Sequence, residues 1–343
     1  MKVTVIGTGF GQYAMAPVYR KLGFEVEVIT PRDQRKVDRA LAADADLVSI
    51  HSPPFMHHDH VMRALDHGHA VLCDKPFGLN AAQAHAMRNR ARERGVLHFL
   101  NYEVRSKPSR AKVKQLVKEG AIGTPCHLSW TFFSNGLRAS NYGWVNEQER
   151  GGGWIRAYAS HCIDFIRWLF ESEVAACGGI SRIEIPKLPD KAGVERSVTA
   201  EDAYCAWFIM KNGCTANQDT AYGAAVALPM YIHVTGSEGA IELIGEKVTV
   251  RRAPWHSPGA TIPAAERIRR GLLPGQGDEV YEFPPPAGEA HEPALLPWLE
   301  RVKEAIRTGR QIAPSFDDGV AVAEVMDQLR ASAAQPKLSM SPL

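Results

Sequence analysis

Short apolar runs alternate with helical stretches through the first third of the chain. Apolar strands are predicted at residues 2–6, 26–29, 46–50 and 70–73. Apolar positions at helical spacing predict helices over residues 13–22, 59–66 and 81–94. Strands that alternate with helices indicate a parallel, doubly wound sheet, whose ligands bind at the carboxyl ends of the strands.

The pattern changes near residue 122, after a predicted helix over 110–119. A Gly-Thr-Pro break at 123–125 leads into longer strands, predicted at 126–133, 204–210 and 231–235. A glycine turn begins the segment 151–170, which continues as a long helix, and another helix is predicted over 314–334. We therefore expect two domains, residues 1–122 and 123–343, in an α/β protein.

Prolines and glycines are frequent between residues 253 and 286, and periodicity is poor there. We expect a long loop with one short helix near 264–270. A surface insertion and a mobile lid are both compatible with this composition.

Composition and charge exclude several classes of protein. The 343 residues are 45% hydrophobic and 23% charged, as in a folded globular protein, and the formal net charge is only +2. This balance favours neither a nucleic-acid partner nor a membrane surface. The six cysteines form no Cys-x-x-Cys pair, and the first strand begins at once, so we expect reduced thiols, no targeting segment and a cytoplasmic location.

A glycine-rich turn follows the first predicted strand and opens the first helix. Gly7 would make the tight turn, and Gly9 would let the backbone approach a pyrophosphate at the helix N-terminus, beside Thr8 and Phe10. In the G-x-G-x-x-G pattern of dinucleotide sites the third glycine would fall at Gln12, whereas the sequence has Gly11 one place early. The turn alone is also compatible with a purely structural role.

The second predicted strand ends without the acidic residue that binds the ribose of NAD. The chain reads Thr30, Pro31, Arg32 and Asp33 there. A hydroxyl and a guanidinium suit a 2′-phosphate, because arginine forms charge-assisted bonds to phosphate oxygens. We therefore expect NADP, with NAD as the alternative in which Arg32 is solvated and Asp33 takes the ribose.

Six motifs in order resemble the glucose-fructose oxidoreductase/inositol dehydrogenase (Gfo/Idh/MocA) family. After the glycine turn, residues 52–57 (SPPFMH) are similar to the family's T-P-N-x-x-H, and residues 74–76 (DKP) to its E-K-P. Residues 105–108, the GGG turn at 151–153 with His161 and Asp164, and residues 314–319 (PSFDDG) complete the match. The resemblance covers nearly the whole chain and implies a Rossmann domain plus a C-terminal domain with a large, mainly antiparallel open sheet.

The resemblance also implies roles for individual residues. The E-K-P lysine of the family lies beside the nicotinamide ribose and the substrate hydroxyl, so Lys75 is expected to anchor both and to relay a proton. Ser52, Pro53 and His57 are expected at the cofactor, Asp74 at the ribose or in a structural role, and Arg105 at the substrate. The residues expected to bind cofactor are Gly7, Thr8, Gly9, Phe10, Gly11, Thr30, Arg32, Ser52, Pro53, His57, Asp74 and Lys75.

The run of residues 57–60 (HHDH) raises the question of a metal. Adjacent histidines at a helix start diverge in direction, and no further ligand with suitable spacing follows. We expect no metal site.

The substrate side departs from the family at one position. The family often reads D-x-x-x-H on the helix after the glycine turn, and its histidine, supported by the aspartate, transfers a proton. Here His161 is present but the aspartate is replaced by Ala157. Tyr158 and Asp164 lie three residues on either side of His161, so either is expected to orient or assist it, and Tyr158 is expected in catalysis and substrate binding.

The expected function is an NAD(P)-dependent oxidoreductase that moves a hydride between nicotinamide and a hydroxyl or carbonyl carbon of a sugar, cyclitol or related polyol. Two alternatives stay open: a dinucleotide-using glycosidase or lyase that oxidises its substrate transiently, and a non-catalytic NAD(P)-binding regulator. We expect a homodimer or homotetramer formed through the C-terminal sheet.

Overall fold

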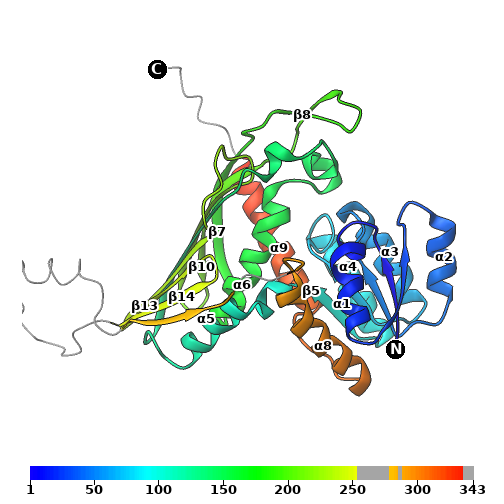
Figure 1. Cartoon of the computed structure of the whole chain (residues 1–343), viewed down its shortest axis with the longest axis horizontal. Coiled ribbons are helices and arrows are strands. Elements are labelled where there is room, and N and C mark those ends of the chain that lie inside the picture. Colours follow the sequence, from blue (N-terminus) through cyan, green and yellow to red (C-terminus); the bar gives the residue numbers. More distant parts are fainter. Residues whose placement is uncertain (253–277, 285–287, 335–343) are drawn as a thin grey trace, which may run out of the picture.

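The computed structural model describes residues 1–252, 278–284 and 288–334. Its N-terminal part is built on a parallel five-stranded sheet with the order β2-β1-β3-β4-β5 (Figure 1). These strands are β1 (Lys2–Ile6), β2 (Glu25–Ile29), β3 (Leu47–Ile50), β4 (Val71–Asp74) and β5 (His98–Asn101). Strands β3 and β5 are buried at every position, which is typical of parallel strands covered by helices on both faces.

Helices connect these strands and cover the sheet. They are η1 (Gly11–Met15) continuing into α1 (Ala16–Lys21), α2 (Gln34–Ala42), α3 (Pro54–Asp66) and α4 (Ala81–Arg94). After β5 the chain forms the short helix η2 (Glu103–Ser106) and then α5 (Pro108–Lys118). The α/β class with a Rossmann-type sheet is confirmed.

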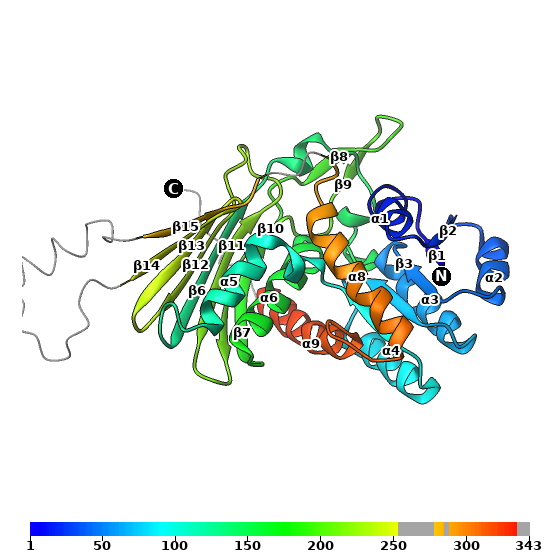
Figure 2. The same ribbon diagram turned by 60° about the horizontal axis from the view of Figure 1, so that its bottom comes forward.

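Helix α8 (Glu292–Thr308) comes from the C-terminal third of the sequence but covers the N-terminal sheet. Its Leu295, Trp298 and Leu299 are buried in one cluster with Val5 and Phe99 of the sheet. Figure 2 shows this helix, in orange, beside the blue N-terminal elements. The first domain is therefore completed by a distant segment of the chain.

The second sheet has eight strands in the order β15-β14-β13-β12-β6-β11-β10-β7. Its strands are β6 (Pro125–Phe133), β7 (Val174–Arg182), β10 (Ala203–Met210), β11 (Thr215–Ala221), β12 (Tyr231–Gly236), β13 (Gly239–Ile244), β14 (Lys247–Arg252) and β15 (Glu279–Glu282). All neighbours pair antiparallel except β11 and β6, which are parallel. The predicted large, mainly antiparallel sheet is confirmed, and a small hairpin, β8 (Lys187–Pro189) and β9 (Glu195–Ser197), stands apart from it.

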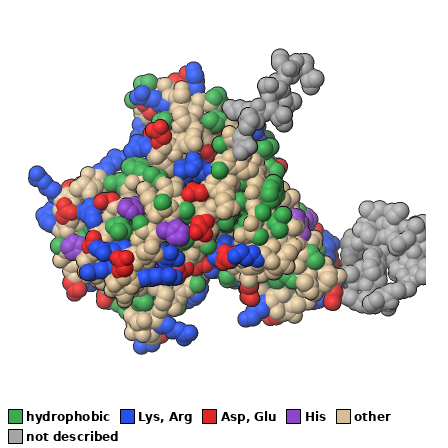
Figure 3. Space-filling view, turned by 180° about the vertical axis from the view of Figure 1, so that it is seen from behind, with side chains coloured by type: hydrophobic (Ala, Val, Ile, Leu, Met, Phe, Trp, Pro, Cys, Tyr) green, Lys and Arg blue, Asp and Glu red, His purple; other side chains and the backbone are tan. Residues whose placement is uncertain are grey.

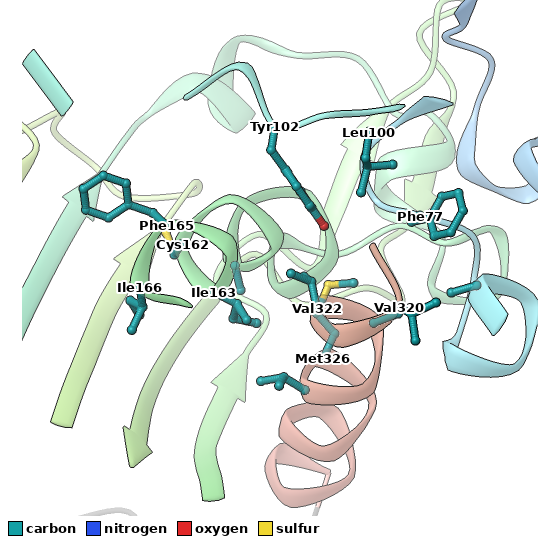
Figure 4. Packing of buried hydrophobic residues seen from close by; sticks show 14 of the residues in the cluster. Phe77, Leu100, Tyr102, Cys162, Ile163, Phe165, Ile166, Val320, Val322 and Met326 are labelled. Atoms are coloured by element: carbon teal, nitrogen blue, oxygen red, sulfur yellow. The ribbon is translucent and has the colours of Figure 1, made fainter. Parts of the chain in front are cut away.

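Two helices join the sheets: α6 (Ser160–Phe170), which follows the π-helical turn η6 (Ile155–Ala159), and α9 (Phe316–Ala333). Their apolar side chains share one buried cluster with residues of the N-terminal domain. Figure 4 shows Tyr102, which follows β5, pointing toward these helices, with Ile163 of α6 and Met326 of α9 beside it. The core is thus continuous from one domain to the other.

Several predicted elements differ from the structure at their ends. Helix α3 begins at Pro54 rather than at residue 59, because proline is well suited to the first turn of a helix. The predicted loop over 253–286 is wrong at residues 279–282, where β15 pairs antiparallel with β14. The predicted short helix at 264–270 lies outside the described residues.

A buried ion-pair triad holds η2, α6 and α9 together. Arg105 of η2 donates from Nε to Asp164 of α6 at 2.8 Å, and from Nη2 to Asp318 of α9 at 2.8 Å. Only 8% of Arg105 is exposed. The structure therefore engages this guanidinium in the triad, where both of its partners are carboxylates of the protein, and not at the substrate as expected from the sequence. Asp164 is likewise occupied by Arg105 and does not assist His161.

Among the described ranges, no helix combines the length and the apolar character that crossing a bilayer requires.

Replacing Arg105 tests whether the triad is structural. Arg105→Met leaves two buried carboxylates without their main cation, so the free energy of unfolding should fall by about 3–5 kcal/mol in chemical denaturation. Arg307→Met, which removes an exposed pair with Glu304, should leave the free energy of unfolding nearly unchanged. An Arg105→Met protein that keeps its stability but loses turnover would restore Arg105 to the substrate.

Candidate active site

A cavity of about 670 Å³ opens where the parallel strands end. Its walls come from the segments after β1, β3, β4 and β5, and from the turn η6 and the start of α6. Ligands of doubly wound sheets bind at this edge. The residues that line the cavity include Thr8, Gly9, Phe10, Pro31, Arg32, His51, Ser52, Pro53, Asp74, Lys75, Glu103, Trp144, Ala157, His161, Lys191 and His291.

The glycine turn has the shape that a pyrophosphate needs. A Cβ on Gly7, which has φ +155°, would lie 2.5 Å from the carbonyl oxygen of His51. A Cβ on Gly9 would meet no atom within 4 Å, and Gly9 lines the cavity, so a ligand can approach its backbone. The residues present therefore fit a dinucleotide.

Gly11 performs the task of the third glycine from a position one residue early. Its Cβ would lie 2.9 Å from Val5 Cγ1 and 3.0 Å from His51 Cβ, which is the close approach of helix to strand that this glycine permits. The helix begins with a π-helical turn over Gly11–Met15. The imperfect motif is therefore compatible with the expected packing.

The segment after β2 brings a cation to the outer end of the cavity. Arg32 is exposed and lines the cavity beside Pro31, whereas Thr30 is absent from the lining residues. Asp33 accepts a hydrogen bond from the Lys36 backbone at 3.1 Å as the N-cap of α2, and it does not line the cavity.

Lys191 is a second cation here, and no motif in the sequence predicts it. It stands in the turn of the β8–β9 hairpin of the other domain, yet it lines the cavity together with Arg32. A neighbouring cavity of about 810 Å³ also has Arg32, Trp144 and Lys191 in its walls. The two cavities therefore adjoin at these residues.

His57 lies behind the cavity rather than in its wall. It is buried, and its ring nitrogens lie 2.7 Å from the Ser52 carbonyl oxygen and 3.0 Å from that of Pro76. Ser52 and Pro53 line the cavity as expected. The structure thus gives His57 the task of holding two lining loops together, in place of the expected direct contact.

Asp74 ends a buried chain of hydrogen bonds. Tyr19 Oη, Ser49 Oγ and His51 Nε2 are linked at 2.9 and 2.8 Å, and His51 Nδ1 lies 3.1 Å from Asp74 Oδ2. Burial acts to raise the pKa of Asp74, but the hydrogen bond and charge of His51 and the charge of Lys75 lower it to about 2. Asp74 is therefore a fixed negative charge beneath Lys75.

Lys75 and His161 meet at the inner end of the cavity. The Lys75 ammonium donates to the Ala157 carbonyl oxygen at 2.7 Å, and Ala157 and His161 line the same wall. Burial and the positive charge of Lys75 lower the pKa of His161 to about 3. His161 is thus a neutral imidazole near pH 7.

Tyr158 faces away from this pair. Its hydroxyl accepts a hydrogen bond from Trp130 Nε1 at 3.1 Å, its ring stacks on Trp154 at 4.8 Å, and it is absent from the lining residues. Tyr158 lies within the π-helical turn η6, and the wider turn of a π-helix changes which side chains share a face. The expected neighbourhood of Tyr158 and His161 assumed a regular α-helix, and the structure does not produce it.

Glu103 and His291 are further lining residues that sequence reasoning missed. Glu103 follows β5, so its place at a strand end was a usable signal. His291 precedes α8, and only the packing of that helix brings it here, 3.6 Å from Glu103 by Nδ1 to Oε1. In the described part of the chain, no three His, Cys, Asp or Glu side chains are grouped to hold a metal ion.

Two family descriptions match the sequence. An oxidoreductase family with an NAD-binding Rossmann fold matches residues 24–102, and the GFO/IDH/MocA C-terminal domain matches residues 111–242. Levoglucosan dehydrogenase from Pseudarthrobacter phenanthrenivorans is 24% identical over 318 residues, which cover 87% of this chain and 80% of the relative. The 1,5-anhydro-D-fructose reductase of Ensifer adhaerens is 26% identical over 240 residues, covering 70% and 67%.

Solved structures share the fold along the whole chain. A levoglucosan dehydrogenase complex with NADH and levoglucosan has a TM-score of 0.79 at 22% identity, covering 98% of this chain and 97% of that one. Together with the glycine turn and the ordered motifs, these matches show that the chain belongs to the Gfo/Idh/MocA family and is a nicotinamide-dependent oxidoreductase.

Proposed function

We propose that the protein transfers a hydride between a nicotinamide cofactor and a hydroxyl or carbonyl carbon of a sugar, cyclitol or related polyol. The observation that carries this proposal is the meeting of Lys75 and His161 beside Ala157, in a cavity that begins at the glycine turn. Relatives named as a levoglucosan dehydrogenase and an anhydrofructose reductase act on sugar derivatives, which supports the substrate class.

The chain's own residues position the substrate and move the proton. A bound nicotinamide supplies the hydride chemistry. The Lys75 ammonium uses one donor on the Ala157 carbonyl, and its other donors are free to hold the substrate oxygen. His161, neutral near pH 7, takes the proton from a substrate hydroxyl during oxidation and returns it during reduction. Tyr158 supports the wall from behind through its contacts with Trp130 and Trp154.

We also propose that the cofactor is NADP rather than NAD. Arg32 and Lys191 approach the outer end of the cavity from two domains, and Asp33 is engaged in capping α2. Two cations suit a 2′-phosphate, whereas the ribose of NAD is usually held by an acidic residue. The solved relatives with NADH make NAD the alternative to be tested.

A titration of both cofactors tests this preference. NADPH should bind more tightly than NADH to the parent protein. Arg32→Ala should weaken NADPH by roughly 1–3 kcal/mol, the scale of a charge-assisted bond, and Lys191→Ala should weaken it in the same direction, while NADH affinity changes little. Fluorescence titration of reduced cofactor gives all these constants. Equal affinities in the parent protein would contradict the preference.

Lys75 and His161 are tested by turnover. Lys75→Met and His161→Asn should each reduce turnover by about a hundredfold or more while preserving folding and cofactor affinity, as the loss of a positioned acid or base does. Tyr158→Phe serves as the control with a small effect, because its hydroxyl faces Trp130. Absorbance at 340 nm reports net cofactor reduction, so product formation without an absorbance change would favour the transient-oxidation reaction. Normal turnover in both variants would remove the pair from the mechanism.

The outer face of the eight-stranded sheet is proposed as the contact with a second copy of the chain, in a homodimer or homotetramer. Ile180 of β7 and Trp207 and Ile209 of β10 are exposed there, Trp207 to 48%. Figure 3 shows hydrophobic side chains gathered on the half of the molecule that carries this sheet. Apolar patches on a folded protein mark contact surfaces.

Charge placed on this face should prevent assembly. Trp207→Glu is expected to convert the parent oligomer to monomers in sedimentation velocity, because the carboxylate would be desolvated in the contact. Leu228→Glu, at an exposed leucine outside the sheet's strands, is the control that should leave the assembly intact. A parent protein that sediments as a monomer at micromolar concentration would contradict the proposal.

The six cysteines all carry free thiols. Reduced thiols are usual in proteins of reducing compartments, and we propose a cytoplasmic location on this ground. Detection of the native protein in a membrane or extracellular fraction would contradict it.

A further inference from the structure

Buried polar atoms without partners collect around His161. Two short segments contribute them, one after β5 and one at the start of α6. Among the described residues, no hydrogen-bond partner is found for Asn101 Oδ1, Tyr102 Oη, Glu103 Oε2, Ser160 Oγ and His161 Nδ1. Buried polar groups are normally paired. Of these five residues, Glu103 and His161 line the cavity, so their unpaired atoms lie at the proposed site.

Glu103 is the only one of these that carries a full negative charge at neutral pH. Its residue is 4% exposed and lines the cavity with His161. Burial acts to raise the pKa of Glu103, but the neighbouring imidazoles of His161 and His291 lower it below its usual value. The carboxylate is thus ionised, with Oε1 facing His291 and Oε2 unengaged.

We propose that Glu103 is the positioning residue for His161, a carboxylate that stabilises the protonated imidazole in place of a carboxylate at position 157. The inference rests on the proposed function and deepens it. Ala157 and His161 line the same wall, but the alanine methyl can offer no charge to the ring. Glu103 supplies that charge from the opposite segment, after β5.

The charges around the ring explain why such a residue is needed. Lys75 and Arg110 disfavour protonation of His161, as does burial, whereas Glu103 and then Asp74 favour it. Asp74 already accepts bonds from His51 and from the Lys75 backbone. Glu103 therefore has the carboxylate oxygen that is free to act on the imidazolium formed when a substrate hydroxyl gives up its proton.

His291 contacts Glu103 and is one of the groups that lower the pKa of its carboxylate. It lies on the solvent side, with 44% of its side chain exposed, and its ring contacts Phe10 at 5.0 Å. Contact with Glu103 raises the pKa of His291, with Glu289 acting in the same direction and Lys75 against it. His291 thus holds the Glu103 carboxylate in place, and this carboxylate acts on His161.

The test compares Glu103→Gln, Glu103→Asp and the double variant Glu103→Gln/Ala157→Asp with the parent protein. Glu103→Gln should keep cofactor affinity within about twofold but lower the plateau of turnover in the oxidation direction at least about tenfold. Because the imidazolium loses its stabilising charge, the acid limb of the pH profile should move to lower pH. Glu103→Asp should retain part of the turnover.

A carboxylate restored on the other side of the His161 ring distinguishes a loss of charge beside the ring from a loss of packing. Glu103→Gln/Ala157→Asp should recover at least about a third of the lost turnover on a logarithmic scale, and it should return the acid limb toward the parent position. Glu292→Gln is the matched control, since this partly exposed glutamate one residue after His291 pairs with Lys21 and should leave turnover unchanged. Unchanged turnover and pH profile in Glu103→Gln, or a double variant as slow as the single one, would overturn the proposal.

A measurement without cofactor keeps the inference distinct from the proposed function. In proton NMR of the free protein, the pKa of His291 should fall in Glu103→Gln, because the contact that raises it is lost. A His291 pKa that does not change would overturn the proposed arrangement even in an active enzyme. Failure of the parent protein to bind either dinucleotide would instead contradict the proposed function, and the His291 titration would still report on Glu103.

Discussion

The ion-pair triad of Arg105, Asp164 and Asp318 is the constraint on which the site depends. Arg105 lies two residues after Glu103, and Asp164 lies three residues after His161. Asp318 precedes Gly319, whose Cβ, if present, would lie 2.6 Å from Phe77. Phe77 belongs to the loop that carries Lys75. The triad therefore fixes the three segments whose side chains meet at the inner end of the cavity. Because these groups are buried, small displacements would leave charges unpaired, which makes the arrangement stiff.

Two helices begin with turns that are not regular α-helix, and this changes which of their side chains face the cavity. The predictions made from the sequence succeeded for one of these helices and failed for the other. Both segments entering the cavity from a glycine turn begin with π-helical turns, η1 and η6. In the first, Gly11 packs against the strand, although the regular motif places its third glycine at the next residue, Gln12. The prediction of a dinucleotide site is therefore not affected by the imperfect motif. In the second, Tyr158 turns toward Trp130 and leaves His161 beside Ala157. A hydrophobic pattern read at 3.6 residues per turn cannot reveal either change.

Residues at strand ends could be predicted, whereas residues delivered by distant packing could not. The glycine-turn pattern predicted Gly9 at the cofactor, and the family resemblance predicted Ser52 and Lys75 there. All three line the cavity, because parallel strands present their carboxyl ends at one edge. Lys191 and His291 reach the same cavity only because a hairpin of the second domain and the start of α8 fold back over it. The residues next to Lys191 and His291 in the sequence do not indicate that these two side chains line the cavity. Their position depends on contacts with residues that are more than a hundred positions away in the sequence. Their discovery required the tertiary structure.

The charged residues in the wall make the electrostatic potential change from one end of the cavity to the other. Arg32 and Lys191 stand at the outer end, and the buried carboxylates of Asp74 and Glu103 stand at the inner end beside Lys75 and His161. A dinucleotide is anionic along its phosphates, and its oxidised nicotinamide ring is cationic, so a field of this sign favours one orientation of the molecule over its reverse. The inner carboxylates also act on His161, where they oppose the effect of Lys75 on the pKa of the imidazole.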